Sequence, residues 1–71
     1  MIRHNVHSSN LASVGYDPTS AALEVEFLDG RIYQYANVPR SIFSGLMNAA
    51  SKGEYFDRVI KKGGYSCRRL V

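Results

Sequence analysis

The side chains with the clearest chemical potential in this sequence are cationic and lie near its C-terminal end. They are five basic residues and one tyrosine: Arg58, Lys61, Lys62, Tyr65, Arg68 and Arg69. Lysine and arginine neutralise phosphate groups, and an aromatic ring can stack on a nucleobase. Such a cluster is typical of a nucleic-acid-binding surface, although a solvated face that balances acidic neighbours gives the same pattern. We predict these six residues as the candidate nucleic-acid-binding site.

The charge of the chain is distributed unevenly along its length. The net charge is +3 at neutral pH. Residues 1–30 contain one basic and four acidic side chains and carry −3, whereas residues 31–71 contain eight basic and two acidic side chains and carry +6. An anionic partner is therefore expected to bind the second half of the chain.

Other residue types that perform chemistry are too sparse for a catalytic or metal site. A structural zinc site uses about four ordered ligands, and the sequence offers only His4, His7 and one thiol, Cys67. Ser8 and Ser9 are potential nucleophiles, but no spacing pairs them with a base. The glycines form no phosphate-binding motif. We expect no enzymatic activity, no metal or other cofactor and no small-molecule substrate.

Length and composition limit the class of protein. A chain of 71 residues, 45% hydrophobic and 21% charged, is typical of one small globular domain. We place that domain at residues 8–71, after a flexible tail over residues 1–10. The sequence lacks the run of about 18 apolar residues that crosses a membrane, and the tail lacks the apolar stretch of a signal peptide. A single cysteine allows no internal disulfide, so we expect a cytoplasmic protein with no membrane partner.

The first part of the chain predicts an antiparallel meander of three strands. Residues 11–17 alternate well enough for a strand, and Asp17-Pro18-Thr19-Ser20 has the composition of a turn. Residues 22–28 show the clearest strand pattern, because apolar residues alternate with acidic ones. Asp29-Gly30 then indicates a hairpin, which leads into a third strand over residues 31–37.

The register of this hairpin decides which face of the sheet the tyrosines occupy. A two-residue turn at Asp29-Gly30 places Tyr33 and Tyr35 beside the acidic residues of the preceding strand. A three-residue loop, which adds Leu28, places Val25 opposite Tyr33 and keeps both tyrosines on the apolar face. A slip of one residue moves every side chain of a strand to the other face. We favour the three-residue loop, in which the two tyrosines are core residues rather than exposed rings that stack on bases.

The second part of the chain predicts two helices and a last strand. Val38-Pro39 introduces a helix over residues 40–50, whose apolar residues repeat at helical spacing. Ser51-Lys52-Gly53-Glu54 matches the capping box that begins a second helix, and Gly63-Gly64 ends it. Residues 65–71 can form a short strand. The fold class is therefore α+β: a three-stranded antiparallel β-meander, then a helical hairpin packed on one sheet face, then a short C-terminal strand.

Short motifs also follow one another along the chain in a distinctive order. They are Ser8-Ser9, Gly15-Tyr16-Asp17, Asp29-Gly30, Tyr33-Gln34-Tyr35, Val38-Pro39, Ser51-Lys52-Gly53 with Phe56 and Ile60, and a basic aromatic tail from Tyr65. This series covers residues 8–71 and resembles the KTSC family, a small domain named after the C-terminus of some lysyl-tRNA synthetases and also found as free-standing bacterial proteins. The resemblance implies RNA, either single-stranded or tRNA, as the partner.

A protein–protein interaction or adaptor module, for instance a homodimer, is the alternative to RNA binding. A small domain can bury exposed apolar residues against a partner, and Leu28 and Ile32 near the hairpin are candidates. Convergence of the basic residues with Tyr65 on one exposed face would favour RNA. Scatter of these residues, or pairing with acidic side chains such as Asp57, would favour the interaction module.

Overall fold

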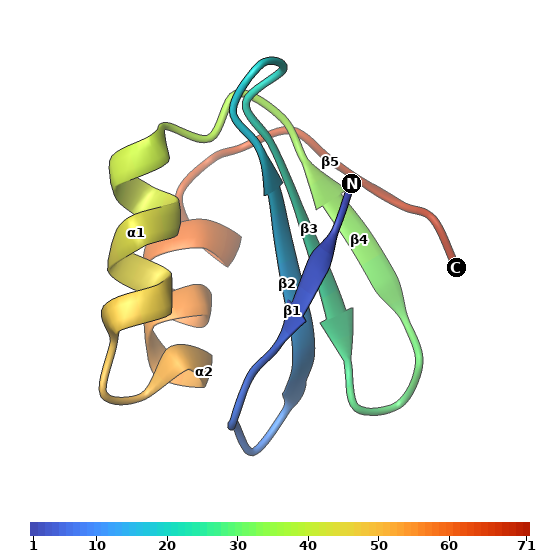
Figure 1. Ribbon diagram of the computed structural model, residues 1–71, viewed down its shortest axis with the longest axis vertical. Helices are drawn as coiled ribbons and strands as arrows, with labels where there is room; N and C mark the ends of the chain where they lie inside the picture. The colour runs from blue at the N-terminus through green and yellow to red at the C-terminus, as the bar shows by residue number, and fades with distance from the viewer.

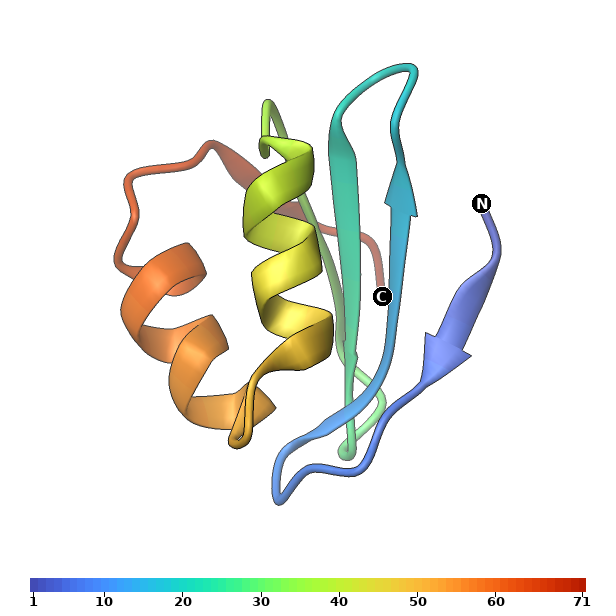
Figure 2. The same cartoon turned by 60° about the vertical axis from the view of Figure 1, so that its left-hand side comes forward.

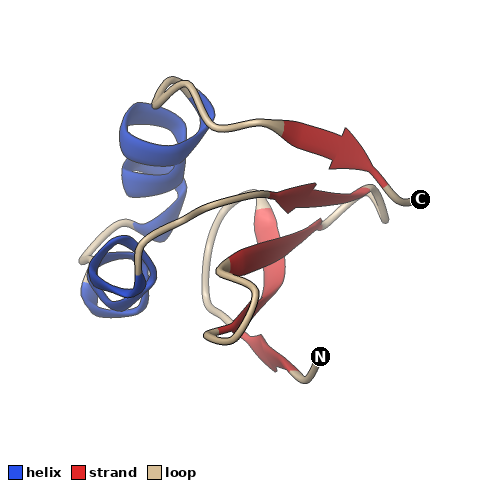
Figure 3. Cartoon of the chain, turned by 90° about the horizontal axis from the view of Figure 1, so that it is seen from above, coloured by secondary structure: helices blue, strands red, loops and turns tan.

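The computed structural model describes residues 1–71 as a sheet that carries the helical segments on one face and leaves the other open (Figures 1 and 2). The strands pair antiparallel, and their order across the sheet follows their order along the chain. They are β1 (Arg3–Asn5), β2 (Leu11–Asp17), β3 (Ala22–Phe27), β4 (Ile32–Tyr35) and β5 (Cys67–Arg69). Between β4 and β5 the chain forms α1 (Arg40–Asn48), α2 (Lys52–Tyr55) and the π-helix η1 (Phe56–Lys61). The α+β class is confirmed, with the helices gathered on one side (Figure 3).

The sheet has one strand more than the meander that we predicted. β1 lies within the segment that we expected to be a tail, and it pairs with β2 through Arg3 opposite Gly15. Its three residues are polar and show no alternation, so they carry no strand signal. Gly15 permits β1 to lie close to β2, because a Cβ atom at this position would be only 2.8 Å from both the Arg3 side chain and the Ile2 carbonyl oxygen. The meander is therefore four strands long, and β5 completes the sheet beside β4.

The hairpin between β3 and β4 has the three-residue loop that we favoured. Val25 lies opposite Tyr33, with Tyr35 two residues further along the same face of β4. Gly30 has a φ angle of 95°, and its N–H donates to the carbonyl oxygen of Phe27 at 3.0 Å. Because paired residues share a face of the sheet, both tyrosines face the helices.

Local signals account for the helix ends. Pro39 is the N-cap residue of α1. At the start of α2, the Ser51 hydroxyl oxygen accepts a hydrogen bond from the Glu54 backbone N–H at 3.3 Å, as the capping motif predicts. α2 continues into η1, whose wider turn brings the Lys62 N–H to the Asp57 carbonyl oxygen at 3.2 Å. The second helix is thus confirmed, but its π-helical half was not expected from the sequence.

The hydrophobic core fills the space between the sheet and the helices. Its buried residues are Leu11, Val14, Leu23, Val25, Tyr35, Val38, Leu46, Phe56 and Ile60. The two helical arms, α1 and the continuous α2–η1 helix, meet where Gly45 leaves room for the ring of Tyr55. The Tyr55 hydroxyl donates to the Ile42 carbonyl oxygen at 3.1 Å, which ties the arms together and holds η1 in place over the sheet.

Candidate nucleic-acid interface

The predicted basic cluster is divided by the alternation of side chains along β5. Arg69 lies opposite Tyr33 and is therefore on the helix side of the sheet, whereas Arg68 lies opposite Gln34 on the open side. On that open side, Gln34 donates a hydrogen bond to the carboxylate of Glu24 at 3.4 Å. The two arginines consequently contribute to different surfaces.

Lys61 and Lys62 lie at the end of η1 and share one carboxylate. Their Nζ atoms are 3.9 Å and 3.2 Å from the two carboxylate oxygens of Asp57. The two lysine side chains are 65% and 70% exposed, and ion pairs at such positions contribute roughly 0–1 kcal/mol. Both lysines can therefore exchange Asp57 for a phosphate group with little loss of stability.

The remaining two residues of the predicted cluster do not join this pair. Arg58 is exposed on η1. Tyr65 is half-buried and packs against the core, and its ring lies 2.8 Å from where a side chain at Gly63 would begin. The six predicted residues are thus spread over both faces of the sheet and the end of η1, and two of them pair with Asp57. By the criterion set out above, the predicted cluster taken as a whole favours the interaction module, and an RNA site can involve only part of it.

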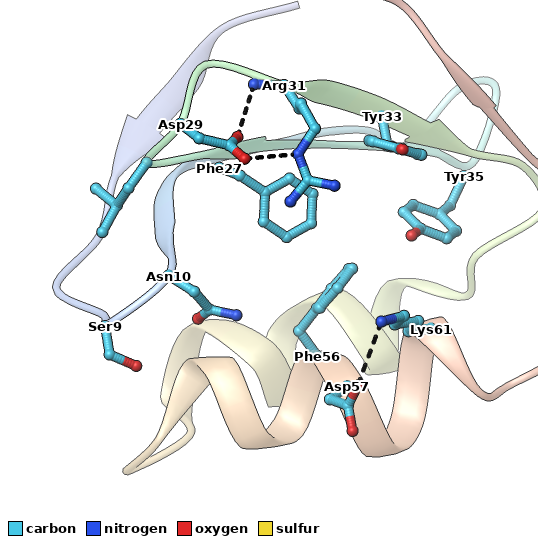
Figure 4. Close-up of a pocket in the computed structure, with 11 residues that line it drawn as sticks. Ser9, Asn10, Phe27, Asp29, Arg31, Tyr33, Tyr35, Phe56, Asp57 and Lys61 are labelled. Atoms are coloured by element: carbon cyan, nitrogen blue, oxygen red, sulfur yellow. Dashed lines mark hydrogen bonds and ion pairs between the residues drawn. The ribbon is translucent and has the colours of Figure 1, made fainter.

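A groove of about 400 Å³ lies between η1 and the β3–β4 hairpin (Figure 4). Aromatic rings form its walls: Phe27, Tyr33 and Tyr35 from the sheet and Phe56 from the helix. Arg31 and Lys61 carry positive charge at its rim, and the Asn10 side chain faces it from the N-terminal side. Aromatic walls with a cationic rim suit a ligand that combines a flat ring with negative charge.

The rings of the groove hold one another edge to face. The Phe56 ring meets Phe27 at a centroid distance of 5.5 Å and an interplanar angle of 75°, and meets Tyr35 at 5.7 Å and 77°. Phe27 also meets Tyr33, at 5.9 Å and 88°. Phe56 and Tyr35 are only 2% and 5% exposed, and such T-shaped pairs contribute about 0.5–1.5 kcal/mol beyond burial. The walls are therefore ordered before a ligand binds.

Ion pairing and burial determine the protonation states of Asp29 and Tyr35 in the groove. The Arg31 backbone N–H donates to Asp29 Oδ1 at 3.1 Å, and Arg31 Nε donates to Oδ2 at 2.8 Å; these bonds, the first above all, hold the pKa of the Asp29 carboxyl below its usual range. The guanidinium carbon lies 5.0 Å from the centroid of the Phe27 ring. Burial raises the pKa of Tyr35 to about 12, so its hydroxyl is a neutral hydrogen-bond donor at physiological pH.

Three of the six residues that the sequence predicted are associated with this groove. Lys61 lines it, and Lys62 adjoins it through the shared Asp57. Arg69 does not line the groove: it lies next to Tyr33 on β5, its Nε atom donates to the Val71 carbonyl oxygen at 2.9 Å, and its charge contributes to lowering the pKa of the Asp29 carboxyl. These cations come from separate parts of the chain, and the fold brings them to one side of the molecule.

Sequence reasoning missed several residues of the groove. Tyr33 and Tyr35 face the core as we predicted, but the same rings also line the groove. Arg31 and Phe27 were not recognised as part of a site. The favoured register contained a usable signal for them, because pairing Val25 with Tyr33 also places Phe27 opposite Arg31 across the hairpin. Phe56 joins the groove only through the docking of η1, which no local pattern indicates.

The structure shows neither a cluster of metal ligands nor a membrane-spanning helix. No three side chains of the histidine, cysteine, aspartate and glutamate types lie close enough together to hold a metal ion. The lone thiol, Cys67, is exposed on β5. No helix has the length and apolar character needed to cross a membrane.

Comparison with known proteins finds relatives over nearly the whole chain. The family model of the KTSC domain matches residues 7–65. An uncharacterised protein from Stutzerimonas stutzeri is 41% identical over 70 residues, which are 99% of either chain. The crystal structure of a KTSC domain protein from Yersinia pestis has a TM-score of 0.90 and 44% sequence identity, and the match covers 99% of this chain and 97% of that one.

Other relatives show the similarity in only one part of a much longer protein. A lysine–tRNA ligase from Nostoc sp. is 48% identical over 46 residues, which are 65% of this chain and 8% of the ligase. The chain therefore corresponds to a small part of that ligase.

Proposed function

The chain belongs to the KTSC domain family, and from this premise we propose that it is a non-catalytic RNA-binding module of the bacterial cytoplasm. The observation behind the proposal is the gathering of four cations beside the aromatic groove. They are Arg31, Lys61, Lys62 and Arg69. Cations that neutralise phosphates, next to rings that can receive unstacked bases, are the two parts of a single-strand binding surface.

The charge balance at the groove favours an anionic ligand. Two acidic side chains lie among the four cations, and each is already engaged: Asp29 with Arg31, and Asp57 with Lys61 and Lys62. A phosphate can replace Asp57 at the exposed lysines, which binds the RNA backbone without a large rearrangement. Binding of this kind depends little on base sequence and strongly on salt.

The similarity to part of a lysine–tRNA ligase supports RNA as the partner. That protein is named for an activity on tRNA, and the shared stretch includes much of this chain. The ligase's activity resides in a much longer protein, so the proposal for this chain concerns RNA contact and not aminoacylation.

The proposal is tested by titrating the protein with labelled single-stranded RNA and with tRNA at several salt concentrations. The logarithm of the binding constant should fall linearly with the logarithm of salt, by about 0.7 per phosphate that is neutralised on a single strand. The four cations predict a slope of roughly −2 to −3 on that basis. Absence of binding at low salt, or binding that salt leaves unchanged, would contradict RNA as the partner.

An adaptor or homodimer is the second candidate, and it is favoured by the exposed Leu28. This side chain lines the groove beside the hairpin and is 61% exposed. Ile32, by contrast, is half-buried and points to the open face, since it pairs with Glu26. The two residues therefore do not form one patch. Sedimentation over a wide range of protein concentration tests the homodimer, which a monomeric mass throughout would eliminate.

A further inference from the structure

We infer that the outer edge of β5 binds an extended acidic segment of a partner protein, which joins the sheet as a further antiparallel strand. The inference does not depend on the RNA-binding function proposed above, because it concerns backbone groups and side chains outside the groove. It follows from the free hydrogen-bonding groups of this edge, from the charges beside them, and from the contrast with β1 at the other edge of the sheet.

β5 is an edge strand that is well ordered on its inner side. It is the last strand of the sheet (Figures 1 and 3), and all three of its residues are exposed. Before β5, the Ser66 carbonyl oxygen accepts a hydrogen bond from the Ala36 N–H at 2.8 Å, and after it the Leu70 N–H donates to the Ile32 carbonyl oxygen at 2.7 Å. The extended segment that β4 holds is therefore longer than β5 itself.

The outward backbone groups of this segment belong to Cys67 and Arg69. In an antiparallel pair, the N–H and C=O of one residue face the partner strand, and those of the next residue face away. Because residues 66 and 70 bond towards β4, Arg68 does so too, and the two residues beside it point outwards. They present two donors and two acceptors, about 7 Å apart along the edge, in the pattern that a further strand matches.

The charges on this edge have no acidic partner in the protein. The ion pairs of the chain involve Arg3, Arg31, Lys61 and Lys62, and neither Arg68 nor Arg69 takes part. Arg69 donates through Nε to the Val71 carbonyl oxygen at 2.9 Å, which leaves its remaining N–H groups available. Arg68 lies on the open side of the sheet and Arg69 on the helix side. An added strand thus meets one cation on each of its faces.

These charges select the strand that can be added. The β5 strand of a second copy would bring four arginines together, and like charges on paired strands repel one another. The same two arginines attract a strand with acidic side chains, and the backbone of that strand supplies a donor and an acceptor opposite each outward residue. An acidic peptide therefore satisfies the backbone and the charges of this edge at the same time.

β1, at the other edge of the sheet, lacks this combination. The Val6 N–H donates to the Ala12 carbonyl oxygen at 3.1 Å, so by the same alternation the outward groups of β1 belong to Arg3 and Asn5. The Arg3 side chain, however, is paired with Glu24 at 3.4 Å within the sheet. Both edges have free backbone groups, but β5 alone adds unpaired charge, and β1 provides an internal control.

The side chains along the edge also predict the order of residues in the partner segment. Leu70 follows on the same open side as Arg68 and is 41% exposed. A strand that runs antiparallel to β5 passes Leu70, then Arg69, then Arg68. It should therefore present an apolar residue followed by two consecutive acidic residues, the first facing Arg69 and the second facing Arg68.

The test uses a labelled peptide of about eight residues, within the usual length of a strand, with valine, glutamate and glutamate at its centre and threonines around them. Fluorescence anisotropy measures its binding to the intact protein at low salt. Methylation of the first glutamate's amide nitrogen, which faces Arg69, should weaken binding by at least about ten-fold, because it removes one hydrogen bond and blocks the approach. Methylation of the second glutamate's amide, which points away from β5, leaves the charge equal and should have little effect. Equal effects of the two methyl groups, or no binding of the unmodified peptide, would overturn the inference and leave the RNA proposal untouched.

Amide hydrogen exchange locates the added strand on the protein. Saturation with the peptide should slow exchange of the Cys67 and Arg69 amides by at least about ten-fold, since each becomes hydrogen-bonded. The outward amides of Arg3 and Asn5 on β1 should exchange at their original rates. Binding that slows neither β5 amide, or that slows the amides of both edges equally, would contradict strand addition at β5.

A pair of variants tests the role of charge. Arg68→Ser combined with Arg69→Ser should weaken peptide binding by about three- to ten-fold, the equivalent of two exposed ion pairs. Arg40→Ser combined with Arg58→Ser removes the same charge from exposed helical positions and should change binding by less than about two-fold. Equal losses in the two double variants would show a general effect of net charge and would overturn the selection of acidic strands by this edge.

Discussion

The ring of Phe56 stands edge-on to the ring of Tyr35, with centroids 5.7 Å apart and planes at 77°. This contact joins η1 to β4, which are far apart in the sequence, and it forms both part of the core and part of the groove wall. Folding and ligand binding therefore depend on the same pair of rings, and each variant must be chosen so that the two effects can be separated.

The importance of this contact for stability can be measured at Phe56. Phe56→Ala removes a ring that is 2% exposed and should lower the free energy of unfolding by about 3–5 kcal/mol, a large share of the total stability of so small a domain. Phe56→Leu keeps most of the volume and should lower it by less than about 1.5 kcal/mol. Urea denaturation compares the variants, and similar losses for both would contradict a tightly packed Phe56.

The phosphate-binding role of η1 is tested by reversing charge at its end. Lys61→Glu combined with Lys62→Glu should abolish RNA binding, because it removes two cations and adds two anions beside the groove. The melting temperature should change little, since both side chains are exposed and their pairs with Asp57 are weak. Arg40→Glu combined with Lys52→Glu makes the same change in net charge away from the groove, and equal loss of binding in both variants would point to a nonspecific effect of charge.

Packing between the helical arms is tested at Gly45. Alanine favours a helix over glycine by about 1 kcal/mol, so Gly45→Ala should stabilise α1 if the position were open. A Cβ atom there would instead overlap the Tyr55 hydroxyl and lie 2.8 Å from the adjoining ring carbon, and overpacking of this kind costs about 1–3 kcal/mol. Thermal denaturation should therefore show a lower melting temperature. Ser44→Ala, an exposed neighbour on α1, is the control and should not lower it.

The three-residue hairpin loop is tested at Gly30. Its φ angle of 95° is one that residues with a Cβ atom rarely adopt, and no atom lies within 4 Å of where that Cβ would be. Gly30→Ala should therefore lower the free energy of unfolding by about 1–2 kcal/mol through backbone strain alone. Denaturant titration measures the loss, and an unchanged stability would contradict the left-handed conformation.

The burial of Tyr35 makes stability depend on pH in the alkaline range. Its pKa is raised to about 12 in the folded protein, against about 10 for an ordinary tyrosine. The native state thus keeps a proton that the unfolded chain releases, so the stabilising effect is complete below about pH 10 and is lost as the pH rises towards 12. Tyr35→Phe should show a shallower fall in stability over this window, and parallel curves for the two proteins would contradict the assignment.

Much of the fold could be predicted from the sequence because its signals are local. The alternation of β3 with the glycine of the Asp29-Gly30 turn favoured the correct hairpin register, because the three-residue loop separates apolar from polar side chains more cleanly than the two-residue turn does. Ser51 and Glu54 specify where the second helix begins, because the cap satisfies backbone groups within one turn. β1 could not be predicted in the same way. Its pairing with β2 depends on the absence of a side chain at Gly15, which lies in a different strand.

The candidate site, too, could be predicted from the sequence only in part. The sequence by itself determined that the second half of the chain is basic, and it favoured the register that places the two central tyrosines on the helix-facing side of β4, which the structure confirms. Only the tertiary structure decided that Arg68 and Arg69 lie on opposite faces of the sheet and that Phe56 closes a groove beside Arg31. The physical reason is that charge and periodicity are properties of a segment, whereas a binding groove is formed by the docking of segments that are distant in the chain.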